Sequence, residues 1–301
     1  MPELPDVTVY VERLNALAVG QTLERLRLAD PFVLRSVEPP PQAFVGRSVR
    51  QASRTGKRIV LAYDGDLFMV FHLMIAGRLH WRPPGAALGG RSSLAALDFP
   101  TGSLILTEEG SKRRASLHLV AGDAALLAFE RDGLDLLTAT PDALGQVLRR
   151  RNRTLKRALT DPDVIDGVGN AYSDEILHRA RLSPFRQTAA MTDDEVQALL
   201  ESARAVLDEW TERLRAEAGQ GFPEKVTAFR PEMAVHGKYG KPCPVCGAPV
   251  QRIRYADNEA NYCAACQTGG RLLADRALSR LLHEDWPRTL AELEERRSPR
   301  L

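Results

Sequence analysis

The stretch that decides the fold of the C-terminal part reads Cys243-Pro-Val-Cys246, then sixteen residues, then Cys263-Ala-Ala-Cys266. It contains all four cysteines of the 301-residue chain. Two C-x2-C pairs at this separation are typical of a structural zinc site, in which four thiolates hold the ion tetrahedrally. Two disulfides are the alternative, which a reducing cytosol disfavours. We therefore predict one structural Zn2+ held by these four residues.

The residues between the cysteine pairs predict a β-hairpin. Residues 248–255 and 259–262 have the composition of two short strands around the turn Ala256-Asp257-Asn258. Such a zinc-bound hairpin either reaches into a nucleic-acid groove or serves only as a structural clip.

Upstream of the cysteines, the chain from about residue 142 has helical patterns. Thr192-Asp-Asp-Glu195 is a capping box, which predicts the start of an amphipathic helix. The helical pattern ends at Gly219 to Gly221. Two further tail helices are expected at 271–282 and 287–297.

A glycine turn, Asp166-Gly-Val-Gly-Asn170, separates helical patterns at 155–159 and 172–179. Glycines allow the backbone to approach a ligand closely, and the free N–H groups of the following helix can bind an anion. A basic run precedes the turn, and it consists of Arg149, Arg150, Arg151, Arg153, Lys156 and Arg157. A solvated helix face is the alternative, but the neighbouring turn favours phosphate binding.

Residues 21–130 predict antiparallel strands. Asp64-Gly65 lies between strand patterns at 58–63 and 66–71, as in a two-residue hairpin. Two more strands flank Pro100-Thr-Gly102, and another spans 115–120. An amphipathic helix from Asp6 to Leu17 precedes the strands. The chain is therefore expected to be α+β, with a two-layer or sandwich domain at its N-terminus.

The N-terminus reads Met1-Pro2-Glu3-Leu4-Pro5-Asp6. Removal of Met1 would leave the secondary amine of Pro2, and an α-amine has a pKa of about 7.7–8.0, well below that of lysine. Such an amine can attack a carbon and form an iminium, while Glu3 could exchange protons with the reacting group. The alternative is that this proline is an ordinary residue near the chain start with no chemical role.

The composition fits a soluble globular protein, with 44% hydrophobic residues, 27% charged residues and a net charge of +2. The length allows two domains. The chain has neither an apolar run that could span a membrane nor the pattern of a signal peptide, so a location in the cytosol is expected. The protein is also expected to be a monomer.

Taken together, Pro2-Glu3, Gly56-Lys57, His72, Gly167-Val-Gly-Asn170 and the four-cysteine hairpin resemble the formamidopyrimidine-DNA glycosylase and endonuclease VIII family of base-excision repair. The resemblance runs from residue 1 to about 267. The lead-in to the cysteines, His236-Gly-Lys-Tyr-Gly-Lys-Pro-Cys243, is closer to the formamidopyrimidine branch than to endonuclease VIII. It implies an N-terminal antiparallel β-sandwich with a flanking helix, then a helix–two-turns–helix domain with a zinc-finger β-hairpin.

The resemblance also implies roles for single residues. Pro2 would attack the sugar C1′ of a damaged nucleotide, Glu3 would move protons, and Lys57 would pair with a phosphate during strand cleavage. Double-stranded damaged DNA would be the partner, with the target nucleotide flipped out of the stack. The expected DNA contacts are His72, Met74, Ile75, Arg113, Arg114, Lys156, Gly169, Asn170 and Asn258.

Several positions depart from the family pattern. Ile75 stands where the branch has a methionine wedge, and Met74 lies beside it; an aliphatic wedge can still unstack a base step. The Arg-Arg-Phe turn of the family becomes Lys112 to Arg114 without phenylalanine. Asn258 stands where an arginine of the finger is expected, and the tail 268–301 has no counterpart in the shortest relatives.

The predicted organisation is a catalytic β-sandwich at 1–130, a linker at 131–141, a helical DNA-binding domain at 142–232, a zinc finger at 233–267 and a helical tail at 268–301. The predicted function is that of a DNA glycosylase with abasic-site lyase activity, a hydrolase and lyase that removes oxidised bases, purines first and pyrimidines as the alternative. A damage-binding protein of the same fold without base excision is a second hypothesis. A zinc-ribbon regulator is a third, and it leaves Pro2-Glu3 and Lys57 unexplained.

Overall fold

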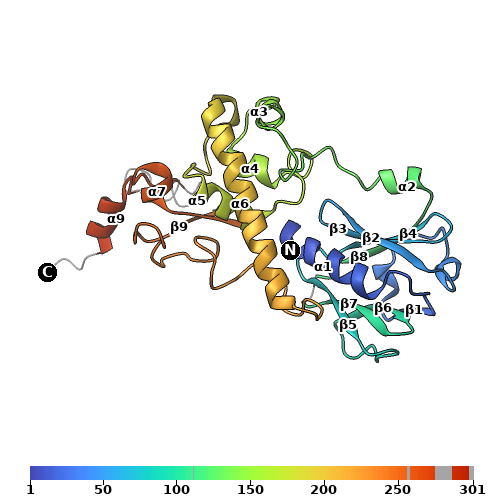
Figure 1. Ribbon diagram of the computed structural model, residues 1–301. Coiled ribbons are helices and arrows are strands. Elements are labelled where there is room, and N and C mark those ends of the chain that lie inside the picture. Colours follow the sequence, from blue (N-terminus) through green and yellow to red (C-terminus); the bar gives the residue numbers. More distant parts are fainter. Residues whose placement is uncertain (111, 256–257, 275–286, 298–301) are drawn as a thin grey trace. The chain divides into compact units, whose positions relative to one another are not determined.

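The computed structural model describes residues 1–110, 112–255, 258–274 and 287–297 (Figure 1). These residues form two compact units. The first comprises Met1–Arg131 together with Asp208–Ala228, and the second comprises Asp132–Leu207 together with the residues from Phe229 onward. None of the described helices combines the length and the apolar character that crossing a bilayer requires.

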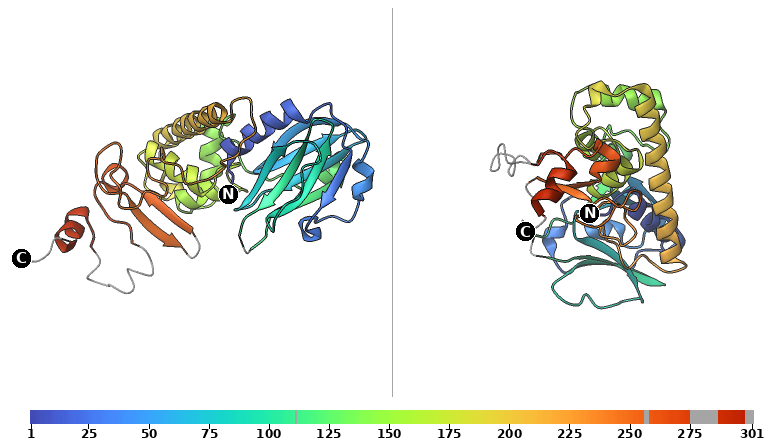
Figure 2. Two further views of the ribbon diagram at one scale, coloured as in Figure 1. Left: turned by 90° about the horizontal axis from the view of Figure 1, so that it is seen from below. Right: turned by 90° about the vertical axis from the view of Figure 1, so that its left-hand side faces the viewer.

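The first unit is an antiparallel β-sandwich, whose two four-stranded sheets are visible in Figure 2. One sheet has the order β1-β6-β7-β5 and the other the order β2-β3-β4-β8. The strand bounds are β1 Arg25–Leu28, β2 Val49–Thr55, β3 Arg58–Tyr63, β4 Leu67–His72, β5 Gly77–Arg82, β6 Ser93–Phe99, β7 Gly102–Glu108 and β8 Ser116–Ala121.

Three of these strands, β1, β2 and β5, are absent from the sequence prediction, and each lies at the edge of its sheet. Edge strands keep polar and charged residues because one side faces solvent, so their hydrophobic alternation is weak. The central strands β3, β4, β6 and β7, which are buried on both faces, match the predicted strands within two residues.

Helix α1 (Leu4–Leu17) contributes Val7, Tyr10 and Leu14 to the core that it shares with both sheets. Burial of each such side chain is worth roughly 1.5–3 kcal/mol. The helix starts two residues earlier than predicted because Leu4 and Pro5 occupy its first turn, where proline is well tolerated. A short helix, α2 (Asp123–Leu127), follows β8.

The second half of helix α6 (Asp193–Ala218) and the segment 219–228 pack with the first unit. Phe222 and Val226 lie in its core, and the Phe222 ring is 5.4 Å from that of Tyr10. The expected domain of residues 142–232 is therefore divided, because the apolar side chains after α6 complete the core of the sandwich.

The second unit is helical and includes the zinc-finger hairpin. Its remaining elements are α3 Pro141–Arg149, α4 Leu155–Thr160, α5 Asn170–Arg179, β9 Gln251–Tyr255, β10 Asn258–Tyr262, α7 Ala264–Thr268 and α9 Leu290–Arg297. Thr192 and Glu195 exchange the two hydrogen bonds of the predicted capping box at the start of α6. The predicted fold class is confirmed. Helix α9 falls within the predicted helix at 287–297. Of the other predicted tail helix, residues 271–274 are not helical and residues 275–282 lie outside the described residues.

Candidate functional site

The chain begins in a buried position of the first unit. Pro2 is buried and Glu3 is only 3% exposed. Glu3 caps helix α1: its carboxylate accepts a hydrogen bond from the N–H of Asp6, and its own N–H donates to Asp6 Oδ2 at 3.0 Å. This reciprocal pair fixes the first residues against the domain.

The N-terminal amine lies in an environment that favours its neutral form. Burial lowers the pKa of the Met1 amine, and the positive charges of Arg78 and Lys57 lower it further, while the carboxylates of Glu3 and Asp6 act in the opposite direction. A neutral amine is the nucleophilic form, so the surroundings suit covalent chemistry at the chain terminus.

Lys57 lies in the turn between β2 and β3 rather than in the strand itself. The preceding Gly56 has a φ of 60°, which places it in the left-handed region that glycine adopts without strain. The turn therefore holds the lysine at one end of the sheet, close enough for its charge to act on the amine.

His72 ends strand β4 and pairs with Arg58 of β3 at the same end of the sheet. Burial lowers the pKa of His72 to about 4, assisted by the charges of Arg58, Lys57 and His118. At neutral pH the ring is therefore uncharged, and it can offer a phosphate a hydrogen bond but no positive charge.

A tight turn after His72 displays Ile75. The Gly77 N–H donates to Leu73 O at 2.8 Å, and Met74 occupies the left-handed region with a φ of 53°. A Cβ at Gly77 would stand 2.2 Å from Leu73 O, so only glycine fits here. Ile75 is 63% exposed, whereas Met74 is half-buried, so Ile75 is the residue that the turn displays.

Arg113 and Arg114, the two arginines after β7 that are predicted to contact DNA, have different surroundings. Arg113 forms an ion pair with Asp30 at 2.6 Å. Glu108 fixes the following backbone, because its Oε2 accepts the N–H groups of Arg114 and Ala115. The Arg114 side chain is exposed and makes no ion pair within the described part of the chain. Arg114 is thus the member of the pair that remains available to a ligand.

In the second unit, the turn before α5 matches the shape that the sequence predicts. Gly167 has a φ of 73°, which requires glycine, and Gly169 caps α5. Asn170 is the first residue of the helix, and its Nδ2 donates to Glu259 O of the finger hairpin at 2.9 Å. The turn and the finger are therefore joined directly.

Lys156 is not placed to bind a phosphate, which corrects the sequence prediction. The side chain is 7% exposed, and its ammonium donates to Asn170 O, Ser173 Oγ and Asp174 Oδ1 at 2.7, 2.8 and 2.5 Å. An ammonium has three donors, and all three are used inside the protein. Asp174 Oδ2 lies 2.8 Å from His236 Nδ1, which extends the buried network to the lead-in of the finger.

Other members of the basic run are also engaged within the unit. Arg149 pairs with Asp193 at 2.6 Å and Arg153 with Asp161 at 2.5 Å. Arg151 and Arg157 are exposed and line, together with Arg153, an open pocket of about 270 Å³. The run is therefore partly structural and partly an exposed basic surface.

Helix α5 joins the finger through Glu175 and His178 as well. The Glu175 carboxylate accepts the N–H groups of Ala234, Val235 and His236 at 2.7–2.9 Å. Further along the helix, His178 Nε2 is 3.2 Å from Cys243 Sγ. With zinc bound, Cys243 would be a thiolate, which can only accept a hydrogen bond, so Nε2 would be the protonated nitrogen and would orient this cysteine.

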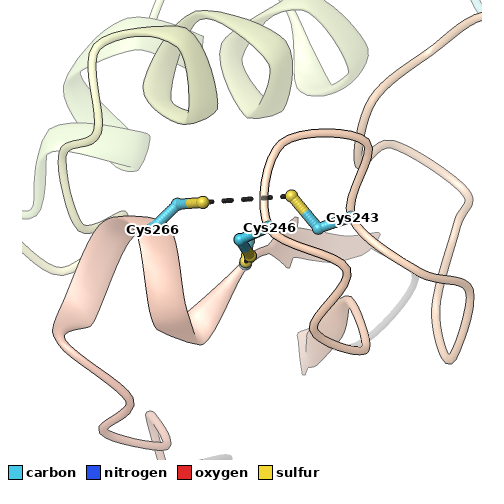
Figure 3. A group of neighbouring side chains, drawn as sticks. Cys243, Cys246 and Cys266 are labelled. Atoms are coloured by element: carbon cyan, nitrogen blue, oxygen red, sulfur yellow. Dashed lines mark hydrogen bonds between the residues drawn. The ribbon is translucent and has the colours of Figure 1, made fainter.

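The four cysteines converge on a zinc site, as predicted. Figure 3 shows Cys243 and Cys246 on the loop before β9 and Cys266 on helix α7. All four sulfurs, including that of Cys263, lie within 4.8 Å of one another. The separations of 3.9 Å for Cys243–Cys266 and 3.4 Å for Cys246–Cys263 bracket the value of about 3.8 Å that tetrahedral Zn–S bonds impose. Four thiolates close the coordination sphere, so the zinc is structural.

Asn258 begins strand β10, but its side chain lies outside the described residues. No motif in the sequence marks Arg78, Asp174, Glu175 or His236 as site residues. A faint signal exists in the two adjacent carboxylates Asp174-Glu175, which lie between the apolar pairs Ala171-Tyr172 and Ile176-Leu177, because buried acids require partners.

The succession of a β-sandwich, a helical unit and a four-cysteine hairpin has counterparts among known protein families. Three family models match in chain order: the formamidopyrimidine-DNA glycosylase N-terminal domain at residues 1–121, its H2TH domain at 134–217, and the zinc finger found in FPG and IleRS at 240–269. The formamidopyrimidine-DNA glycosylase of Thermus thermophilus is 32% identical over 280 residues, which cover 90% of this chain and 100% of that protein. The chain therefore belongs to the formamidopyrimidine-DNA glycosylase family.

Two other relatives agree with this assignment. An uncharacterized formamidopyrimidine-DNA glycosylase-like protein of Mycobacterium tuberculosis is 41% identical over 150 residues, half of this chain and 93% of that protein. The solved structure of the Lactococcus lactis enzyme in complex with DNA containing an abasic site shares the fold, with a TM-score of 0.77, 23% identity, and coverage of 88% of this chain and 99% of that one.

Replacing Asp174 by Asn should destabilise the protein strongly. The substitution leaves the buried Lys156 ammonium without a counter-charge, and breaking a buried pair in this way costs about 3–5 kcal/mol. Urea unfolding gives the free energy directly, with the exposed Asp208→Asn as control, expected within about 0.5 kcal/mol of the original protein. Equal stability of both variants would contradict the structural role of Asp174.

The ring of His72 should remain neutral over most of the physiological range. Its folded pKa of about 4 lies below the unfolded value of about 6.5, so the folded state loses stability as the pH falls from 6.5 towards 4. An NMR titration of the histidine rings in the free protein tests this, and a His72 midpoint near 6.5 would show the ring to be solvated.

Stripping zinc should unfold the finger and leave the first unit folded. The thiolates lose the ion that holds the two cysteine pairs together, as in other small zinc modules. The measurement is zinc content by mass spectrometry alongside far-UV circular dichroism, with Cys263→Ser as the genetic counterpart. Hairpin amide hydrogens that stay fully protected from exchange in the zinc-free protein would contradict this prediction.

Proposed function

We propose that this chain is a bifunctional DNA glycosylase and abasic-site lyase that uses the amine of Pro2 after loss of Met1. The observation that supports this most directly is the N-terminus itself. Burial and the charges of Arg78 and Lys57 lower the pKa of the Met1 amine at this end of the chain, and the cap of α1 fixes the Glu3 carboxylate one residue after Pro2.

The proposed reaction begins when the Pro2 nitrogen attacks C1′ of the damaged nucleotide. The N-glycosidic bond breaks and its electron pair stays with the base, which takes up the proton that the amine loses. The sugar ring opens as Glu3, in its protonated form, gives a proton to the ring oxygen. The product is an iminium between Pro2 and the sugar. Successive eliminations then expel the phosphates on the two sides of the sugar, with Lys57 beside one of them, and water releases the amine.

The partner is proposed to be double-stranded damaged DNA, as the complex of the Lactococcus lactis relative with abasic-site DNA supports. The exposed Ile75 suits a wedge in the base stack, and Arg114 suits a contact to the opposite strand. We propose His72, Gly169 and Asn170 as phosphate contacts, and Asn258 as a finger contact. Oxidised purines are the proposed substrates, with oxidised pyrimidines as the alternative, and the enzyme is expected to act as a monomer in the cytoplasm.

Borohydride should trap the processed protein covalently on DNA that contains an oxidised or abasic site. Pro2→Gly should reduce the adduct at least tenfold, because a primary amine on a flexible residue replaces the fixed secondary amine. A preparation in which mass spectrometry shows Met1 retained should give no adduct, because Pro2 is then an amide.

Duplexes that each contain one defined lesion would identify the base that is removed. DNA binding without any adduct, from protein with a free Pro2, would instead favour a damage-binding protein of the same fold.

A further inference from the structure

The open pocket of the second unit lies where the loop before α4 meets residues 187–190. Its volume is about 270 Å³. A water molecule takes up about 30 Å³ of the liquid, so the pocket has room for a phosphate group together with bound water. Three guanidiniums line it, those of Arg151, Arg153 and Arg157, against the single carboxylate of Asp161. This arginine pocket therefore has a net positive charge.

The carboxylate of the arginine pocket is already engaged inside the protein. Asp161 Oδ2 accepts a hydrogen bond from Arg153 Nη1 at 2.5 Å, and Asp161 Oδ1 accepts the N–H of Asp163 at 3.1 Å. Arg151 and Arg157 are exposed, and their side chains form neither an ion pair nor a hydrogen bond within the described part of the chain. Two guanidiniums are therefore available to a ligand.

A buried threonine fixes the backbone that carries two of these arginines. Thr188 has no exposed surface. Its Oγ1 accepts the N–H of Arg153 at 3.1 Å and donates to Arg151 O at 3.2 Å, and its own N–H donates to Arg153 O at 2.9 Å. Because the loop is held in place before any ligand arrives, binding costs little backbone entropy.

Asn152 adds an uncharged donor to the arginine pocket. Its Oδ1 accepts the N–H of Ala189 at 3.2 Å, which leaves the NH2 group of the amide available to a ligand. The available groups of Arg151, Asn152 and Arg157 are thus donors, which suit an anion. A planar guanidinium matches two oxygens of a phosphate at once, and the proposed DNA partner supplies phosphate.

We propose that the arginine pocket is a phosphate-binding site, formed by other residues than the glycine turn at 167–170. In the complex the phosphate belongs to the DNA backbone, and in the free protein inorganic phosphate or a phosphate ester can occupy the same place. The inference rests on the proposed function because it takes DNA as the partner, but it requires no reaction at Pro2. Within the basic run, Arg151 and Arg157 then bind phosphate, whereas Lys156 is structural.

The first test uses the free protein and inorganic phosphate. In an NMR titration at constant ionic strength, the Nε–Hε signals of Arg151 and Arg157 should shift together and reach saturation at one dissociation constant. Arg150 is the internal control, because it is an exposed member of the same basic run that does not line the pocket.

The second test uses a duplex that carries a stable abasic-site analogue, with binding followed by fluorescence anisotropy over a range of NaCl concentrations. The double variant Arg151→Gln/Arg157→Gln should bind about tenfold more weakly at a given salt concentration, because it loses charge-assisted hydrogen bonds. The slope of log K against log [NaCl] should fall by about 0.9 for one lost phosphate contact. Arg150→Gln is the matched control and should keep the original slope. Thermal unfolding of each variant checks that it is folded.

The combined outcomes separate the two sources of phosphate. Weaker DNA binding in the double variant alone supports a contact to the DNA backbone, with or without a saturable shift by inorganic phosphate. A saturable shift with unchanged DNA binding would assign the pocket to a free phosphate ester.

Unchanged DNA binding without a saturable shift would overturn the proposal. An equal loss in Arg150→Gln would overturn it too, because it would show a diffuse effect of positive charge. The failure of the proposed function looks different: protein with a free Pro2 would form no borohydride adduct, whatever the pocket variants do to DNA binding.

Discussion

The docking of helix α1 is the constraint on which the candidate chemistry depends. A chain terminus is ordinarily mobile, and a mobile amine cannot be held at a fixed distance from a sugar carbon. Here Val7, Tyr10 and Leu14 bury one face of the helix in the core of the sandwich, and the reciprocal hydrogen bonds between Glu3 and Asp6 fix its first turn. The first turn of the helix is therefore held against the core of the sandwich, which gives Glu3 a defined position beside Pro2.

Helix α5 has the corresponding role in the second unit. Its first residue, Asn170, contacts the finger hairpin, its middle residues Asp174 and Glu175 hold the lead-in to the finger, and His178 orients Cys243. A single helix of ten residues thus joins the glycine turn to the zinc site. Buried carboxylates are costly unless they are fully hydrogen-bonded, and those of α5 meet this requirement with backbone N–H groups and the Lys156 ammonium.

The sequence predicts best where a physical signal is local. The cysteine spacing predicts the zinc site, the capping box at Thr192 predicts the start of α6, and the glycines at 167 and 169 predict the tight turn. It predicts poorly where burial depends on distant partners. The basic neighbours of Lys156 predict that it lies on the surface. Its ammonium is instead buried and donates hydrogen bonds to Asp174 and Ser173. Edge strands such as β1 also escape prediction, because solvent on one side erases their alternation.

The sequence by itself determined which chemical groups this protein possesses: an N-terminal proline next to a glutamate, a lysine in a glycine turn, and four zinc-binding thiols. Each is recognisable because its meaning lies in the residue type and in short spacing along the chain. Only the tertiary structure decided that Arg78 contacts both Ile75 and Val226, that Arg113 is engaged by Asp30 while Arg114 is exposed, and that burial lowers the pKa of His72. These properties depend on burial and on charges brought together from distant segments, and no local pattern encodes them.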